Sequence, residues 1–456
     1  MRTTCRTRAP RAGSRALAIG LALAIGLANG LALGGARAAS AQAAEADPRA
    51  RISELLLGCP DAVRAARFES EVRALGGDGL PVLFDLLQNG LLTAEMRGRI
   101  TPAQAEQLLE GVATFPREAL RGFIDHGLGE DLSFHARRTA LLALGRNGDS
   151  RDIRSVTRIW KPAETADAGT LDELGAALRE SIAGILRRDE RSNLQLRSLL
   201  VNVEAEALPH LARGIGAAGT SAGLDLLPRF LDVSPELDLV ALEEIERLAR
   251  QNLAPFPSHV VWATRRFLDH DGDGTARLAV AALGSLEDAE SIPRFLELLA
   301  ADDLGMRRTA HRALRAVTGL DFKSDPRRWK SWYESELAWW HASADDEFAR
   351  LQAREPAVVG LAIRAICSRR LYRHELATEL VPLLYHTDST IRLLACSGLG
   401  AIGSGLAIPA LIEQLDGPDE AVCAGAWRAL VQLSGRELPA DAEAWRSLFP
   451  EHRGPR

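Results

Sequence analysis

The chain contains an internal repeat with an offset of 116 residues. The segment that begins at Ala282 superposes without a gap on the segment that begins at Gly398. Repetition at a fixed offset indicates an architecture in which no unit buries its apolar face alone and each unit stacks on its neighbours. The matched pairs are Leu283 with Leu399, Gly284 with Gly400, Ile292 with Ile408, Pro293 with Pro409, Ala310 with Ala426, Leu314 with Leu430, Gly319 with Gly435, Asp325 with Asp441 and Trp329 with Trp445.

The apolar residues within each copy recur at helical spacing. In 278–283 and 292–299 they form the stripes of amphipathic helices of about three turns. No comparable run alternates apolar and polar residues at the period of a strand, so the predicted fold is all-α. We expect five residues to bound the helices, Gly284 and Gly400 as C-terminal glycine caps and Asp302, Asp303 and Asp388 as N-caps.

Two short motifs recur along the chain. Proline after an apolar residue marks helix starts, because its missing N–H has no intrahelical partner there. Where an Asp is followed four residues later by an Arg, the Asp can cap a helix while the Arg reaches a carboxylate of a neighbouring repeat. The motifs are Leu80-Pro81, Leu208-Pro209, Leu227-Pro228, Ile292-Pro293, Val381-Pro382 and Ile408-Pro409, and the pairs Asp273 with Arg277, Asp303 with Arg307 and Asp388 with Arg392.

Together these residues resemble the HEAT-repeat family, in particular the bacterial subtype similar to the HEAT-like repeats of phycobilisome lyases. The resemblance is clearest in 274–299 and 389–415 and spans 268–448. It implies an α-solenoid of stacked antiparallel helix pairs, with roughly 40 residues per pair. It also implies which helices line the concave side and carry the partner contacts: 275–284, 304–317, 388–400 and 419–433.

The N-terminus has the form of a secretory signal peptide. Arginines precede an uncharged apolar run over 16–36, and small residues follow. We expect cleavage after Ala41 or Ala43, so that the mature chain is exported to the periplasm or the exterior. An uncleaved anchor is the alternative, since about 20 apolar residues can span a bilayer, but the glycines and Asn29 within the run disfavour a stable span.

The predicted organisation has six parts. Polar or charge-rich stretches at 161–170 and 345–355 are expected to be joints at which the solenoid bends. The parts are the signal peptide (1–43), N-terminal HEAT-like repeats (44–160), divergent helical repeats (161–268), HEAT-like repeats with a Trp-rich end (269–340), C-terminal HEAT-like repeats (341–449) and a tail (450–456).

Charge limits the class of partner. The signal segment holds six arginines and no acid, so the mature chain has 49 basic residues (55 minus six) against 61 acidic ones, a net charge of −12. Such a chain is disfavoured as a nucleic-acid binder. Arginine far outnumbers lysine, which together with the alanine content indicates a GC-rich bacterial source.

Four cysteines remain after cleavage: Cys59, Cys367, Cys396 and Cys423. The last three lie in apolar helical stretches, where a buried free thiol is the favoured interpretation. A disulfide between Cys396 and Cys423 is the alternative, because adjacent repeats can bring two such helices together and export permits the bond.

Two stretches resemble metal motifs only in part. Asp269, Asp271 and Asp273 match the start of a calcium-binding EF-hand loop, but its twelfth position, a bidentate Glu in that motif, is Val280. We therefore expect an inter-helix turn, with weak calcium binding as the alternative. The segment from His374 begins like a zinc-protease helix, but Thr378 replaces the second histidine. With no catalytic motif, we expect neither an enzyme nor a cofactor.

Half of the eight tryptophans cluster in 329–340. The repeat places Trp445 at the position of Trp329. Packing in the core is therefore the favoured role for this cluster. Adjacent helical residues cannot both point inward, so Trp339 and Trp340 are the candidates for partner contact. The predicted function is a non-catalytic scaffold that binds a protein or peptide on its concave face. A chromophore-lyase-like enzyme, suggested by the repeat subtype alone, and a calcium-dependent adhesion module are the alternatives.

Overall fold

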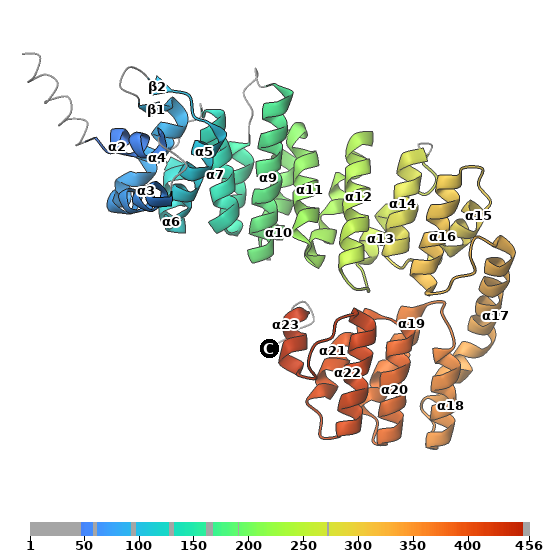
Figure 1. Cartoon of the computed structure of the whole chain (residues 1–456). Coiled ribbons are helices and arrows are strands. Elements are labelled where there is room, and N and C mark those ends of the chain that lie inside the picture. Colours follow the sequence, from blue (N-terminus) through green and yellow to red (C-terminus); the bar gives the residue numbers. More distant parts are fainter. Residues whose placement is uncertain are drawn as a thin grey trace, which may run out of the picture.

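The computed structural model describes residues 47–57, 62–92, 97–126, 132–160, 167–189, 191–270 and 273–449. Over these residues the helices follow one another in layers along a curved ribbon (Figure 1). The predicted all-α solenoid is confirmed. One small departure is a hairpin of two-residue strands, β1 (Leu91–Leu92) and β2 (Arg97–Gly98). The predicted signal peptide and the tail lie outside the described residues.

The helices form two rows, after an N-terminal end made of α2 (Pro48–Leu57), α3 (Ala62–Ala74) and α4 (Gly79–Asn89). Successive members of the first row pack extensively against each other from α5 to α16 and again from α18 to α22. The first row contains α5 (Pro102–Ala113), α7 (Phe134–Asn147), α9 (Ala168–Arg188), α11 (Leu208–Ala218), α12 (Pro235–Gln251), α14 (Asp273–Ser285), α16 (Leu304–Thr318), α18 (Pro356–Cys367), α20 (Ser389–Ile402) and α22 (Glu420–Ser434). The second row contains α6 (Arg117–His126), α8 (Ile153–Ile159), α10 (Ser192–Leu199), α13 (Ser258–Arg265), α15 (Ile292–Leu298), α19 (Arg373–Leu380), α21 (Ile408–Leu415) and α23 (Ala442–Leu448).

Aspartates begin the helices largely as predicted. Asp303 and Asp388 accept hydrogen bonds from backbone N–H groups at the starts of α16 and α20, which satisfies donors that have no intrahelical partner. The prediction for Asp302 is wrong, because the N-cap of α16 is the next residue, Asp303. Of the Asp–Arg pairs, Arg392 does reach the next layer, where it contacts the carboxylate of Asp419 at 2.8 Å.

Gly284 and Gly400 do not end helices, which corrects their prediction as caps. Both are buried inside α14 and α20. A Cβ at Gly284 would lie 2.6 Å from the Cα of Ala313, and one at Gly400 would lie 3.1 Å from the Cα of Ala429. These glycines therefore let successive first-row helices approach closely. The C-terminal caps are left-handed glycines one residue beyond the helices: Gly319 after α16, Gly403 after α20 and Gly435 after α22.

The long helix α17 (Pro326–Arg350) separates two hydrophobic cores. The N-terminal block has its core over 52–329, to which Leu371 from beyond α17 is added, and the rest of the buried residues over 351–449 form the core of the C-terminal block. In Figure 1 the C-terminal block doubles back beneath the N-terminal block. The joint expected at 345–355 coincides with this boundary, but its first part is the end of α17 and is not helix-poor.

The repeat also explains the buried tryptophans. Trp329 and Trp445 are fully buried, and each indole N–H donates to a carbonyl six residues upstream, of Lys323 and Pro439, at 2.8 Å in both cases. Their predicted role in the core is confirmed. Among the described residues, no helix combines the length and the hydrophobicity that a membrane crossing requires.

The three described cysteines are free thiols. Cys396 is buried and Cys367 and Cys423 are half-buried, so the alternative disulfide between Cys396 and Cys423 is absent from this structure. Burial raises the pKa of Cys367 and of Cys396 to about 11. Cys59 lies outside the described residues.

Candidate binding surface

The exposed side of the first row is hollowed between α9 and α16. One hollow of about 460 Å³ lies among α9, α11 and α12, and another of about 810 Å³ lies among α12, α14 and α16. Three acids, Glu180, Glu244 and Glu246, line these hollows with eight arginines. We call these arginines the arginine face: Arg179, Arg187, Arg213, Arg247, Arg250, Arg277, Arg308 and Arg312.

Most of the arginine face has no acidic partner. Arg247 pairs with Glu244 at 2.7 Å and Arg250 with Glu246 at 3.8 Å. The other six form no ion pair with any residue that the structure describes. Arg187 donates instead to the carbonyl of Ala217 and Arg312 to the hydroxyl of Thr309. The surface therefore presents several guanidinium groups that no carboxylate binds directly, on a chain whose overall charge is negative.

Of the four segments expected to carry partner contacts, 275–284 and 304–317 contribute to this surface, and 388–400 and 419–433 line neither hollow. Residues 275–284 supply Arg277, Leu278 and Ala281 to the larger hollow, and 304–317 supply Arg308 and Arg312 among others. The arginines themselves were not singled out from the sequence. Their signal was available in the spacing of Arg308 and Arg312, which places both on one exposed face of the same helix.

The repeat shows that packing alone does not require this arginine content. The offset of 116 residues places Ala424 of α22 where α16 has Arg308, whereas Arg428 matches Arg312. Both Arg308 and Ala424 are exposed. An alanine thus satisfies the same position of the fold, and Arg308 is a feature of the N-terminal block.

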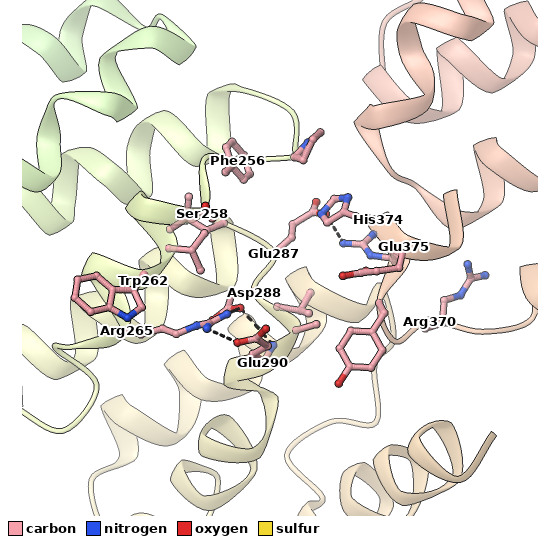
Figure 2. Close-up of a pocket in the computed structure, with 17 residues that line it drawn as sticks. Phe256, Ser258, Trp262, Arg265, Glu287, Asp288, Glu290, Arg370, His374 and Glu375 are labelled. Atoms are coloured by element: carbon pink, nitrogen blue, oxygen red, sulfur yellow. Dashed lines mark hydrogen bonds and ion pairs between the residues drawn. The ribbon is translucent and has the colours of Figure 1, made fainter. Parts of the chain in front are cut away.

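A second candidate is a cleft of about 360 Å³ at the junction of the two blocks (Figure 2). Phe256, Trp262 and Arg265 line it from the N-terminal block, and Arg370 and His374 line it from the C-terminal block. Trp262 is 63% exposed. The cleft therefore lies between two parts of the same chain, each of which supplies charged groups to its lining.

Three contacts close this junction. The carboxylate of Glu287 pairs with Arg373 at 2.8 Å, and Arg373 also donates to the carbonyl of Ala316 at 3.2 Å. Gly405 lies so close to Ala254 that a Cβ would collide with its carbonyl oxygen. Burial raises the pKa of Glu287, while Arg373 acts in the opposite direction. The junction is therefore a direct, partly desolvated contact between the blocks.

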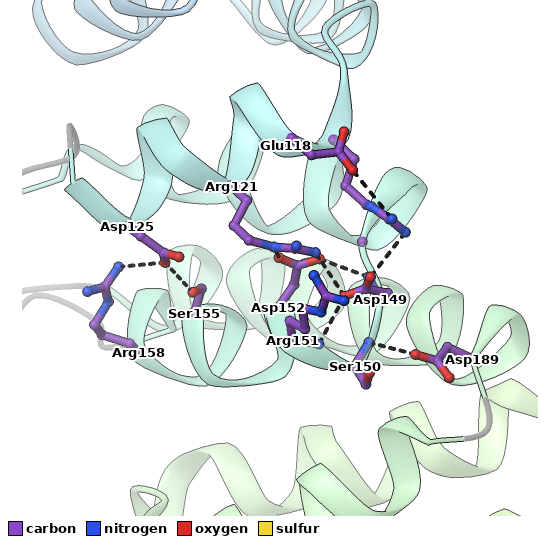
Figure 3. Close-up of polar contacts among 12 residues, drawn as sticks. Glu118, Arg121, Asp125, Asp149, Ser150, Arg151, Asp152, Ser155, Arg158 and Asp189 are labelled. Carbon is purple, nitrogen blue, oxygen red and sulfur yellow. Dashed lines mark hydrogen bonds and ion pairs between the residues drawn. The ribbon is translucent and has the colours of Figure 1, made fainter.

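An arginine–aspartate contact, here called the polar lock, ties each of two second-row helices, α6 and α13, to the turn of the next layer. Arg121 of α6 contacts Asp152 through Nε at 2.6 Å and through Nη2 at 2.8 Å, and its Nη2 also donates to Asp149 at 2.8 Å (Figure 3). Arg265 of α13 contacts Asp288 in the same way, with 2.6 Å from Nε. These contacts are buried or nearly so, and they fix the stacking of the layers.

Near the junction of the two blocks, the corresponding contact joins two uncharged side chains. His374 Nδ1 lies 2.8 Å from the hydroxyl of Ser404, the residue that the repeat offset places on Asp288. Burial, and then the neighbouring Arg373, lower the pKa of His374 to about 4. The imidazole is therefore neutral at physiological pH and not a protonated partner of Glu287, although its Nε2 lies 3.5 Å from that carboxylate.

The predicted site residues whose side chains the structure describes, Asp269, Trp339 and Trp340, line neither the two hollows nor the junction cleft. Asp269 pairs with Arg294 at 2.8 Å, Asp271 lies outside the described residues, and the side chain of Asp273 is not among those described. Within the described ranges no group of three acids, histidines or cysteines could hold a metal. The weak calcium site thus remains a prediction.

Trp339 and Trp340 are both half-buried, and they brace α17 against the C-terminal block. The guanidinium of Arg369 lies 4.8 Å from the ring centre of Trp339. The ring of Trp340 lies 4.7 Å from that of Tyr372. Neither tryptophan lines either hollow of the first row or the junction cleft.

No family model matches the chain, and no curated protein matches it. Solved structures do match. One, titled as the crystal structure of an engineered protein, is 16% identical over an alignment that covers 85% of this chain and 99% of that chain, with a TM-score of 0.33.

Proposed function

We propose that the mature chain is an exported, non-catalytic scaffold that binds a protein or peptide through the exposed side of its first row. The observation that carries the proposal is the pair of hollows between α9 and α16, lined by arginines of which most have no acidic partner. Arginine is enriched in the binding centres of protein interfaces. Free guanidinium groups gathered in hollows are therefore a ready contact surface.

The packing of the first row supports its placement on the inner side of the ribbon. Small residues meet where first-row helices cross: Gly145 on Ser181, Gly284 on Ala313 and Gly400 on Ala429. When helices lie closer together in one row than in the other, the ribbon curves toward the row with the closer helices. A partner held there contacts several layers at once.

A steric block tests the proposal. Ala281 of α14 lines the larger hollow, and Glu297 of α15 is exposed on the second row. We expect tagged mature chain with Ala281→Trp to lose the partner that wild type retains from the cell envelope of the native host. The matched variant Glu297→Trp should retain it. Equal retention by both variants would place binding elsewhere and contradict the proposal.

A further inference from the structure

We infer that the arginine face binds an acidic, extended peptide segment. This inference rests on the proposed function and adds the chemistry of the partner. Guanidinium groups bind carboxylates through paired N–H donors, and complementary charge selects the partner and speeds its encounter. A chain with a net negative charge that gathers eight arginines around two neighbouring hollows is complementary there to an anion.

The spacing of the arginines fits an extended backbone. Five successive first-row helices, α9, α11, α12, α14 and α16, each contribute at least one arginine. Packed helices lie roughly 8–10 Å apart, and an extended peptide advances about 3.3 Å per residue. A carboxylate at about every third residue would therefore meet one helix after another. About 12 residues would cross the whole face.

The lining favours a peptide over a nucleic acid. Single-stranded nucleic acids are held by aromatic side chains on which the bases stack. Among the described residues that line the two hollows, none is Phe, Tyr or Trp. Leu278 and Ala281 of the larger hollow also offer apolar contact to the side chains between the carboxylates.

The arginines most suited to a test are Arg308 and Arg312. Both are exposed on α16, and neither forms an ion pair with a described residue, so that replacing them leaves no buried charge unpaired. Arg428 on α22 is the matched control, because the repeat offset places it on Arg312 and it is exposed in the C-terminal block.

The test is a titration of the mature chain at low salt with four repeats of Glu-Ala-Ser. Its controls are the same peptide with Gln for Glu and a 12-nucleotide single-stranded DNA. We expect the Glu peptide to bind at least tenfold more tightly than the Gln peptide and the DNA. The double variant Arg308→Glu with Arg312→Glu should lose at least tenfold in affinity for it, with an unchanged circular dichroism spectrum, and Arg428→Glu should bind as wild type.

Three results would overturn the inference: no binding of the Glu peptide, equal loss in Arg428→Glu, or DNA binding as tight as that of the peptide. The proposed function is tested separately, by the steric block. Suppose that Ala281→Trp releases the native partner and the double charge reversal does not. The proposed scaffold function is then supported, and the inference that its partner is acidic is contradicted.

Discussion

Glu287 and Arg373 form an ion pair of 2.8 Å between the two blocks, and their side chains are only 25% and 12% exposed. The pair joins the C-terminal block to the turn that follows α14, beside the contacts of Arg373 with Ala316 and of Gly405 with Ala254. The shape of the whole chain therefore depends on a contact between side chains as well as on the ribbon itself.

Arg373→Ala should loosen this junction. The substitution leaves the carboxylate of Glu287 partly buried without its cation. We expect this to weaken the contact between the blocks by roughly 1–3 kcal/mol. We expect small-angle scattering to show a larger radius of gyration than that of wild type, with unchanged helix content. Arg364→Ala, at an exposed position of α18, is the control and should scatter as wild type. An unchanged radius in Arg373→Ala would show that Gly405 and Ala254 hold the junction without the ion pair.

His374 should make stability fall in mild acid. Its pKa is 6.5 in the unfolded chain and about 4 in the folded one, so between these values only the unfolded chain takes up the proton. The stabilisation is complete above pH 6.5 and is lost as the pH falls toward 4, by at most about 3 kcal/mol. The groups that face the imidazole are Arg373, Glu287 and Ser404.

Urea unfolding at pH 7.5 and pH 5 measures this effect. His374→Asn keeps a polar partner for Ser404 but does not titrate, so we expect its loss of stability over this interval to be smaller than that of wild type. The pKa of Glu287 is raised and acts with the opposite sign, since protonation removes the cost of its buried charge. The difference between the stability losses of wild type and variant therefore gives the contribution of His374. An identical loss in both would assign the pH dependence to other groups.

Arg121 should be among the most important polar residues of the N-terminal block. Its removal leaves the carboxylate of Asp152, which is 0% exposed, without a cation. Breaking a buried pair in this way costs about 3–5 kcal/mol. Arg117→Ala is the matched change one turn earlier on α6, and its side chain is 41% exposed, so we expect a loss below about 1 kcal/mol. Chemical unfolding of both variants tests the contrast, and similar losses would refute it.

Gly284→Ala and Gly122→Ala should act in opposite directions. A Cβ at Gly284 meets the backbone of Ala313, so α14 and α16 must separate, at a cost of about 1–3 kcal/mol. At Gly122 in α6 the new Cβ meets nothing within 4 Å, and a more helix-prone residue should add about 0.5–1 kcal/mol. Thermal unfolding midpoints measure both changes. A stable Gly284→Ala would mean that the first row is not closely packed.

The repeat allowed the layers to be predicted, because helical spacing and aspartate caps are local properties. It also predicted that Trp329 and Trp445 share a buried position, since a residue that recurs at one place of a repeat meets the same neighbours. The role of Gly284 was misjudged, because its constraint comes from Ala313 on the next first-row helix and not from its own helix.

The junction could not be predicted from the sequence. Glu287 and Arg373 belong to different layers, and their contact depends on the direction in which α17 sends the chain. The arginine face is an intermediate case. Each arginine lies at an exposed or half-buried helical position, but their convergence on two hollows depends on how five helices stack.

The central claim is that the first row, and not the second, is the binding side. Photo-crosslinking in the native host tests it most directly, with benzoylphenylalanine in place of Ala281 on α14 or of Glu297 on α15. We expect a discrete crosslinked product from position 281 and none from position 297. A product from position 297 alone, or products of equal yield from both, would contradict the account.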